Sequence, residues 1–261
     1  MGFSAKWLSL REPADHAARD SGLLAAAVKA AGAAPVIVDL GCGTGATIRA
    51  FAKHLQQTAV WRLLDNDPVL LRHAAKSTQD RVTTHQVDLR DLDALPLKGA
   101  SLVTASALLD LCSRVWVNEL AERLAAQALP FYAALNYNGV MRWSPADHAD
   151  DAVTFAFNRH QRGDKGFGAA LGPDSADATA EVFGAAGFKV VQANSHWRLG
   201  PSEADLQSEL FAGIASAAAE AGEDEADKWL QARIGQLNVV HCQIGHRDLL
   251  ALPPGTYLDV T

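Results

Sequence analysis

The ten residues Val-Ile-Val-Asp-Leu-Gly-Cys-Gly-Thr-Gly (36–45) decide the predicted fold of this chain. The first five are largely β-branched and apolar, as in a strand covered on both faces within a parallel sheet. The three glycines indicate a sharp turn, because glycine reaches backbone angles that other residues adopt only at a cost and lets a ligand approach the main chain. Residues 46–55 then have the pattern of a helix, whose first amide groups are free to bind a ligand.

The order of strand and helix repeats after this unit. We expect strands at 60–64, 82–87, 101–105 and 131–135, and helices at 68–77 and 115–129. Such alternation indicates parallel strands joined by right-handed crossovers. Further strands at 188–193 and 246–251, the last antiparallel beside the fifth, complete a predicted α/β fold: a doubly wound, mostly parallel seven-stranded sheet. The remaining expected helices lie at 14–31, 147–161, 175–186, 203–221 and 224–235.

Composition and charge exclude several classes of protein. Hydrophobic residues make up 49% and charged residues 20% of the 261 residues, as in a globular chain with a buried core. The net charge of −7, without a basic run, argues against a nucleic-acid partner. Cys42, Cys112 and Cys242 lie far apart without a Cys-x-x-Cys spacing, so neither disulfides nor a metal site are expected. This cysteine usage favours a reducing cytoplasm, and with no long apolar run we expect neither export nor membrane insertion.

The glycine loop by itself leaves two classes of cofactor open. Gly41 to Ala46 satisfies the dinucleotide pattern G-x-G-x-x-G/A, and Asp65 lies at about the spacing expected for an acid that binds a ribose. Two further acids favour another cofactor. Asp39 precedes the loop, and Asp88 follows the third predicted strand.

Three segments resemble the motifs of the class I S-adenosylmethionine-dependent methyltransferase family. Val38 to Gly45 is similar to the first motif, Leu64 to Pro68 to the second, and Val87 to Leu89 followed by Leu95-Pro96 to the third. The resemblance covers residues 36–135 and is weak before and after them. It implies S-adenosylmethionine as the cofactor.

The resemblance also implies roles for particular residues. The glycine loop contacts the methionine part of the cofactor, Asp65 holds the ribose hydroxyls, and Asp88 borders the adenine. Asn66 lies beside the adenine face, and Asp39 supports the loop and the cofactor's amino group. Ser106 joins the site because ligands bind at the carboxyl ends of strands in open α/β sheets. The predicted cofactor site comprises Asp39, Gly41, Cys42, Gly43, Gly45, Asp65, Asn66, Asp88, Leu89 and Ser106.

Several charged residues near this site are also suited to purely structural roles. Asp67 before Pro68 is expected to be a helix N-cap rather than a ligand contact, and Asp88 has the alternative of capping the turn at 90–92. Arg11 and Arg19 are candidates to meet a carboxylate, with surface salt bridges as the alternative.

The acceptor side of the site is predicted from polar residues after the fourth and fifth strands. Asp110, Tyr137 and His160 are the catalytic candidates, with Trp143 as a further pocket wall. Asp110 has the alternative of a helix cap or a solvated acid, and His160 is a candidate general base because histidine titrates near neutral pH. The glycine-rich loop at 162–172 is either a lid over the substrate or a surface loop.

We therefore expect a single domain over residues 1–261. Residues 1–34 provide an N-terminal cap helix, 35–135 the cofactor-binding core, and 136–172 and 200–238 insertions on the substrate side. The expected activity is methyl transfer to a small-molecule acceptor at oxygen, nitrogen or carbon, mainly by positioning, with or without a general base. The alternatives are an NAD(P)-dependent oxidoreductase and a non-catalytic S-adenosylmethionine-binding protein. A homodimer is left open, since the helices at 203–221 and 224–235 could form a pocket wall or a dimer contact.

Overall fold

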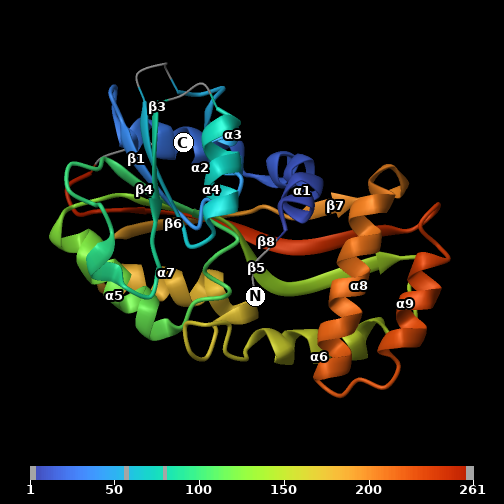
Figure 1. Ribbon diagram of the computed structural model, residues 1–261. Helices are drawn as coiled ribbons and strands as arrows, with labels where there is room; N and C mark the ends of the chain where they lie inside the picture. The colour runs from blue at the N-terminus through green and yellow to red at the C-terminus, as the bar shows by residue number, and fades with distance from the viewer. Residues whose placement is uncertain (1–3, 56–58, 79–80, 257–261) are drawn as a thin grey trace.

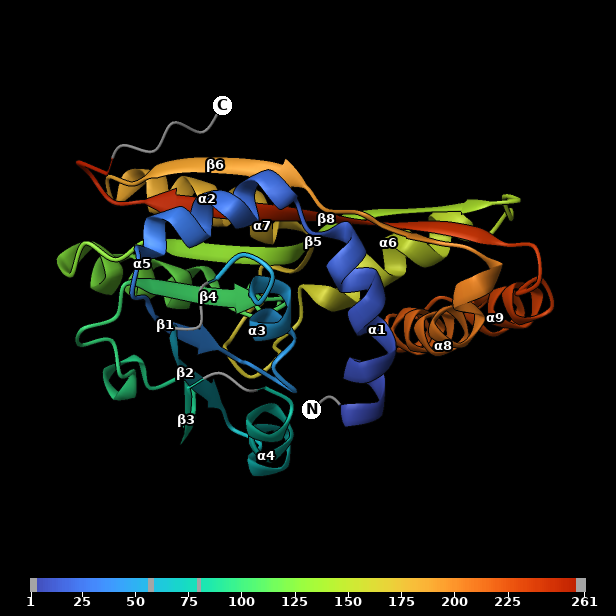
Figure 2. The ribbon, with the colours of Figure 1, turned by 90° about the horizontal axis from the view of Figure 1, so that it is seen from above.

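The computed structural model describes residues 4–55, 59–78 and 81–256. Its strands are β1 (Val36–Leu40), β2 (Val60–Asp65), β3 (Arg81–Gln86), β4 (Leu102–Ser106), β5 (Phe131–Ser144), β6 (Lys189–Asn194), β7 (Trp197–Leu199) and β8 (His241–Leu252). Its helices are α1 (Ala5–Ala18), α2 (Ser21–Ala31), α3 (Ala46–Phe51), α4 (Pro68–Lys76), α5 (Arg114–Ala126), α6 (Asp150–Gln161), α7 (Ser175–Ala185), α8 (Ala204–Glu220) and α9 (Ala226–Ile234). Figures 1 and 2 show them in two views.

The strands form one sheet in the order β3-β2-β1-β4-β5-β8-β6. Strands β1 to β5 pair in parallel, and β8 runs antiparallel between β5 and β6. This confirms the predicted doubly wound, mostly parallel sheet with an antiparallel last strand. The short strand β7 pairs with β8 outside this path and was not predicted.

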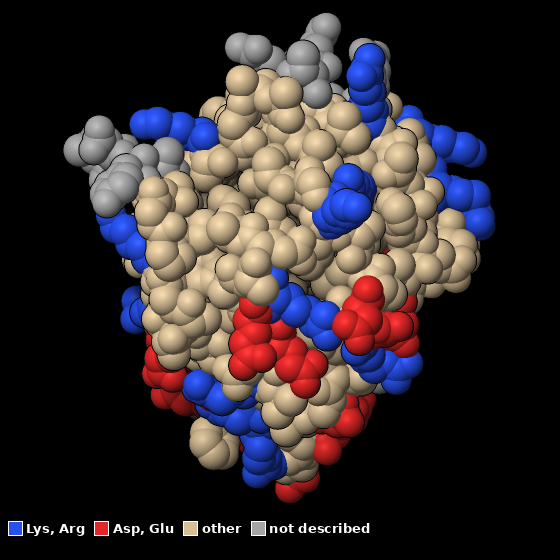
Figure 3. Space-filling model, turned by 90° about the vertical axis from the view of Figure 1, so that its left-hand side faces the viewer, with Lys and Arg blue, Asp and Glu red and all other residues tan. Residues whose placement is uncertain are grey.

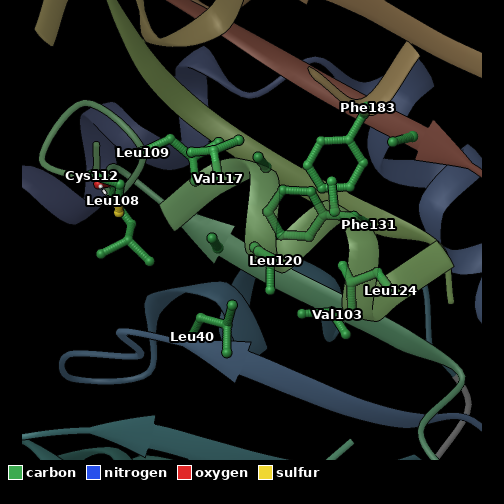
Figure 4. Close-up of a cluster of buried hydrophobic side chains, with 14 of the residues drawn as sticks. Leu40, Val103, Leu108, Leu109, Cys112, Val117, Leu120, Leu124, Phe131 and Phe183 are labelled. Carbon is green, nitrogen blue, oxygen red and sulfur yellow. Dashed lines mark hydrogen bonds between the residues drawn. The ribbon is translucent and has the colours of Figure 1, made fainter. Parts of the chain in front are cut away.

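Two apolar layers cover the two faces of the sheet, because successive strand residues point to opposite sides. Val38, Val103 and Phe131 face α5 and α7, whereas their neighbours Ile37, Leu102 and Tyr132 face α2, α3 and α4. In Figure 1, α5 and α7 lie below the sheet and α2 and α3 above it. Figure 4 shows the first layer, in which the rings of Phe131 and Phe183 stack with their centroids 5.0 Å apart.

The fifth strand is much longer than predicted. We expected it to end at Leu135, but β5 continues to Ser144 and pairs with β8, which begins at His241 rather than His246. Register shifts on either side of Asn136 and Tyr137 bend this ribbon. The polar sequence after Leu135 is typical of a loop; only pairing with the distant strand β8 makes it a strand.

A third apolar cluster lies on this extension. Helices α6, α8 and α9 pack on the ribbon formed by β5 and β8. Trp143 of β5 belongs to this cluster together with Phe211 of α8 and Trp229 of α9. In both ribbon views these helices lie at the end of the molecule away from β3. The predicted substrate-side insertions, 136–172 and 200–238, supply most of this cluster. Their role toward an acceptor stays a prediction.

The N-terminal segment forms two helices, which corrects the single helix expected at 14–31. Helix α1 begins at Ala5 and contains Pro13, and the chain turns at Arg19 and Asp20 before α2. The side chain of Asp20 accepts a hydrogen bond from the backbone N of Leu23 at 2.8 Å, an N-cap that starts a new helix. The break lets α1 leave the sheet and approach the glycine loop (Figure 2).

Surface charge is mixed on the side of the molecule drawn in Figure 3. Acidic and basic side chains are interleaved over the lower half of this face, and uncharged residues cover most of the rest. No helix in the described part of the chain is long and apolar enough to cross a membrane.

Candidate active site

A cleft of about 330 Å³ lies where β1, β2 and β4 end. Helix α1 forms one wall, the glycine loop and the residues after β2 and β3 form the floor, and the loop after α6 closes one side. Ligands of open α/β sheets bind at this edge. The predicted cofactor residues that line the cleft are Gly41, Cys42, Gly43, Asp65, Asn66, Asp88, Leu89 and Ser106. Asp39 and Gly45 do not line it.

The glycine loop has the backbone that its sequence predicts. Gly41, Gly43 and Gly45 all have positive φ angles, of 64°, 52° and 85°. A Cβ atom added at Gly43 would lie 3.0 Å from Cδ1 of Leu8, so glycine is also what allows α1 to approach the loop. Gly45 is the N-cap of α3. Its place behind the loop explains why it does not reach the cleft.

Asp65 holds the loop in place from the end of β2. One carboxylate oxygen accepts a hydrogen bond from the backbone N of Gly43 at 2.9 Å, and the other accepts one from the backbone N of Asp67 at 3.0 Å. The side chain of Asp67 in turn accepts from the backbone N of Val69 at 2.7 Å and caps α4. Asp67 is therefore the N-cap that its position before Pro68 predicts.

Asp88 occupies the outer rim of the cleft. Its two carboxylate oxygens each lie 2.9 Å from Nε of Arg90, and this charged hydrogen bonding lowers the pKa of Asp88 to about 2. The next residue, Leu89, is buried, and its carbonyl accepts a hydrogen bond from Nε1 of Trp116 at 2.7 Å. Asp88 is thus ionised at neutral pH, and a ligand would have to share it with Arg90.

Asp39 is buried beneath the loop. Thr104 donates a hydrogen bond to one oxygen at 2.7 Å, while the other oxygen has no partner among the residues described. Burial raises the pKa of Asp39 to about 7, although the positive charge of Arg19 opposes this. Asp39 therefore has an unused acceptor oxygen behind the cleft.

Arg19 lines the cleft from the end of α1. Nη2 donates a hydrogen bond at 2.9 Å to the hydroxyl of Ser106, which also lies 3.1 Å from the hydroxyl of Thr47. The residue is only 7% exposed, and its Nε and Nη1 have no hydrogen-bond partner in residues 4–55, 59–78 and 81–256. This burial contradicts the alternative of a surface salt bridge. A buried cation with unused donors is suited to an anionic ligand group.

The comparison with known families agrees with this geometry. Residues 37–130, which contain the glycine loop, Asp65 and Asp88, match the family described as "Methyltransferase domain". This segment therefore resembles a methyltransferase domain. No curated protein sequence matches the chain.

Solved structures share the fold of the methyltransferase domain and its surroundings. The cyclopropane-fatty-acyl-phospholipid synthase-like protein from Lactobacillus casei is 14% identical with a TM-score of 0.57, covering 97% of this chain and 95% of that chain. The cyclopropane synthase MmaA2 from Mycobacterium tuberculosis is 13% identical with a TM-score of 0.54, covering 95% and 94%. YcgJ from Bacillus subtilis is 16% identical with a TM-score of 0.53, covering 89% and 98%. At these identities the likeness shows the fold alone.

The predicted catalytic residues lie at different depths behind the cleft. Asp110 is close enough to Arg11 and Lys165, which line the cleft, for their charges to affect it. Burial nevertheless raises the pKa of Asp110 to about 6, and one of its oxygens has no partner in the described chain. It is not the cap of α5, because Ser113 fills that position, and it is partly buried rather than fully exposed.

Tyr137 does not line the cleft. Its hydroxyl donates a hydrogen bond to Asn158 at 2.8 Å, and its ring packs against Phe157 and His246. Trp143 is also buried in the cluster below the ribbon. Both were expected at the sheet edge because β5 was expected to stop before them. We therefore leave them out of the proposed acceptor site.

His160 does not line the cleft either. Its Nε2 is 3.1 Å from a carboxylate oxygen of Glu220 on α8, and its Nδ1 is 3.1 Å from Nζ of Lys165. Lys165 itself lines the cleft. The residue at the cleft is therefore Lys165, and His160 contacts this lysine from behind.

Several cleft residues were missed or left undecided by sequence reasoning. Leu8 and Arg11 on α1, Thr47 on α3 and Phe167 in the loop after α6 all line the cleft. Arg11 forms two hydrogen bonds to Asp15, at 2.9 and 3.1 Å. These residues belong to no common pattern along the chain, so local spacing could not find them. Within the described residues, no group of three or more His, Cys, Asp or Glu could hold a metal ion.

Proposed function

We propose that this chain transfers a methyl group from S-adenosylmethionine to a small-molecule acceptor. The matched family and the cleft at the ends of β1, β2 and β4 support this proposal. The observation that carries it is Arg19, a buried cation with two unused donor nitrogens beside the glycine loop. When bound, S-adenosylmethionine supplies a methyl group already activated by its positive sulfur.

The residues of the cleft match the chemical groups of this cofactor. Arg19 would bind the carboxylate of the methionine part, and Asp39, buried behind the cleft, would support the glycine loop from beneath. Asp65 would hold the ribose hydroxyls by charge-assisted hydrogen bonds. Asn66 and Leu89 would border the adenine, since both line the cleft beyond Asp65.

The contribution of the protein is chiefly to position the acceptor. Placing two reactants in line is worth about 7 to 11 kcal/mol in favourable cases. Asp110 is our candidate for orienting the acceptor: it does not itself line the cleft, but it has an unused oxygen and lies near Arg11 and Lys165, which do. Leu111 and Phe167 add apolar surface on this side of the cleft.

Isothermal titration with S-adenosylhomocysteine tests the cofactor assignment. The wild type should bind, and Arg19→Met should weaken binding about 10- to 100-fold, since hydrogen bonds to charged groups contribute about 1.5 to 3 kcal/mol. Arg114→Met is the matched control, because Arg114 pairs with Glu181 on the surface away from the cleft. Thermal unfolding of each variant checks that it is folded.

The same titration separates the alternatives. Failure of the wild type to bind S-adenosylhomocysteine, or equal affinity of Arg19→Met and Arg114→Met, would contradict the proposal. Binding of reduced nicotinamide dinucleotide in place of S-adenosylhomocysteine would support an oxidoreductase. Binding of S-adenosylhomocysteine without methylation of any acceptor in a broad screen would support a non-catalytic binding protein.

A further inference from the structure

Three side chains form a continuous hydrogen-bonded chain from the cleft to the surface. Nζ of Lys165 lies 3.1 Å from Nδ1 of His160, and Nε2 of His160 lies 3.1 Å from a carboxylate oxygen of Glu220. Lys165 lines the cleft at one end, and the Glu220 side chain is 56% exposed at the other. Two segments of the chain supply the three residues: Lys165 follows α6, which carries His160, and Glu220 ends α8.

The donor and acceptor properties of the three groups give their hydrogen bonds a direction. A lysine donates its N–H groups, so Nδ1 of His160 acts as the acceptor of the hydrogen bond from Lys165. The proton of the neutral imidazole is then on Nε2, which donates to Glu220. Both hydrogen bonds therefore point away from the cleft and toward the solvent.

The loop that carries Lys165 is tied down at both ends. The Asp164 side chain accepts hydrogen bonds from the backbone N of Gly166 at 2.6 Å and of Gly168 at 3.0 Å. Further along, the backbone N of Gly172 donates to the carbonyl of Asp110 at 2.9 Å. These contacts fix the backbone of the loop around Lys165. A fixed position is required of a group that exchanges a proton with a bound molecule.

The surroundings of Lys165 ease the loss of its proton. Burial lowers the pKa of Lys165, although the negative charges of Glu220 and Asp110 oppose this. Asp164 is occupied by backbone N–H groups, and His160 is the direct partner of the amine. A neutral lysine amine has a lone pair that can accept a proton from the cleft side.

We propose that Lys165 is the general base of the methyl transfer, that His160 and Glu220 carry the proton to solvent, and that the acceptor atom is a hydroxyl oxygen or an amine nitrogen. This inference rests on the proposed function and deepens it. The proposal excludes acceptors whose reacting atom carries no proton, because methylation of such an atom requires no general base and no proton transfer through Lys165, His160 and Glu220.

The proton and electrons balance without any other reactant. The acceptor atom forms its bond to the methyl carbon as the carbon–sulfur bond breaks, and the electron pair of that bond remains on sulfur. The O–H or N–H electron pair stays on the acceptor atom, and its proton moves to Nζ of Lys165. Lys165 gives a proton to Nδ1 of His160 as Nε2 gives its own to Glu220, whose exposed carboxyl group releases it to water.

Nuclear magnetic resonance of the whole chain, labelled with ¹³C and ¹⁵N in lysine and histidine and saturated with S-adenosylhomocysteine, tests the inference without an acceptor. The Lys165 signal is assigned by its loss in Lys165→Met. We expect Lys165 to titrate below the other lysines, and the neutral form of His160 to carry its proton on Nε2. Glu220→Gln should shift both the titration of Lys165 and the tautomer balance of His160.

Glu209→Gln is the matched control, since Glu209 also lies on α8 but pairs with Lys6. It should move the titration of Lys6 and leave Lys165 unchanged. A Lys165 that titrates no lower than the other lysines, a neutral His160 with its proton on Nδ1, or no response to Glu220→Gln would overturn the inference while leaving the cofactor assignment intact. Failure of S-adenosylhomocysteine to bind the wild type would overturn both.

Discussion

Asp248 on β8 accepts a hydrogen bond from the backbone N of Asp20 at 2.9 Å, across 228 positions of sequence. The same buried carboxylate accepts hydrogen bonds from the backbone N of Leu135 at 2.8 Å and from the hydroxyl of Tyr132 at 3.2 Å. The last strand therefore holds both the break between α1 and α2 and the bend in β5. Arg19, the proposed carboxylate ligand, directly precedes this break.

Replacing this carboxylate should weaken the fold and the cofactor site together. In Asp248→Asn the amide nitrogen faces a backbone N–H, so at least one buried donor is left without an acceptor. We expect the free energy of unfolding in urea to fall by about 1 to 3 kcal/mol. Affinity for S-adenosylhomocysteine should fall as well, because Arg19 loses its support. The exposed Asp224→Asn is the control, and equal effects of the two variants would contradict the role of Asp248.

The contact between α1 and the glycine loop predicts a specific effect at Gly43. An alanine there would adopt φ of +52° and place its Cβ 3.0 Å from Leu8. Gly99 has a similar positive φ of +74° but nothing within 4 Å of an added Cβ. Both alanine variants should lose about 1 to 2 kcal/mol of stability from the backbone conformation. Only Gly43→Ala should also weaken S-adenosylhomocysteine binding by calorimetry; equal affinities would show that the close approach of α1 is unimportant.

The buried carboxyl of Asp39 predicts a pH-dependent stability. Its pKa rises from 3.8 to about 7 on folding. As the pH rises through this interval, the unfolded chain loses the proton while the folded chain retains it, so the folded state is progressively disfavoured. From pH 5 to pH 8 the free energy of unfolding of the wild type should fall by about 2 to 3 kcal/mol relative to that of Asp39→Asn.

Urea unfolding at both pH values, without cofactor, measures this difference. Asp224→Asn, which alters an exposed acid, should keep the pH profile of the wild type. Parallel profiles for the wild type and Asp39→Asn would show that Asp39 is already ionised in the fold at pH 5.

The third apolar cluster contains a buried ion pair whose disruption should be costly. Arg233 on α9 has a fully buried side chain, pairs with Asp150 and lies over the rings of Trp143 and Trp229, with its guanidinium carbon 5.4 and 5.9 Å from their centroids. Removing one charge leaves the other buried without its partner. Arg233→Met should lower the free energy of unfolding by about 3 to 5 kcal/mol.

A double-mutant cycle isolates this interaction. Arg233→Met combined with Asp150→Asn should cost less than the sum of the single changes. Lys228→Met, which breaks an exposed pair with Glu225 on the same helix, should cost less than about 1 kcal/mol. Additive effects at Arg233 and Asp150 would mean that the two charges do not stabilise each other.

Local pattern was enough to predict the core of the fold. The run at 36–45, the strands at 60–64 and 101–105 and the cap at Asp67 were recognisable because each depends on neighbours in sequence: apolar runs, glycines that require positive φ, and a side chain that caps the next helix. The positions of Asp65 and Asp88 at the sheet edge follow from the same alternation. Both residues line the cleft, as expected from the order of strands and helices alone.

The acceptor side could not be predicted in this way. Asn136 and Tyr137 follow an apolar strand and have the composition of a loop, yet pairing with β8 continues the strand through them. Arg19 was one arginine within a predicted helix, and its burial depends on Ser106, 87 positions away. Lys165 belonged to a loop that was either a lid or a surface feature, and its importance depends on contacts with His160 and the cleft.

The sequence by itself determined the parallel core and its glycine loop, because backbone preference, apolar periodicity and capping act between residues close in the chain. Only the tertiary structure decided where the first helix breaks, how far β5 extends and which polar groups are left buried without partners. Those features depend on contacts between segments far apart in sequence, such as Asp20 with Asp248, whose free energy becomes available only when the whole sheet has formed.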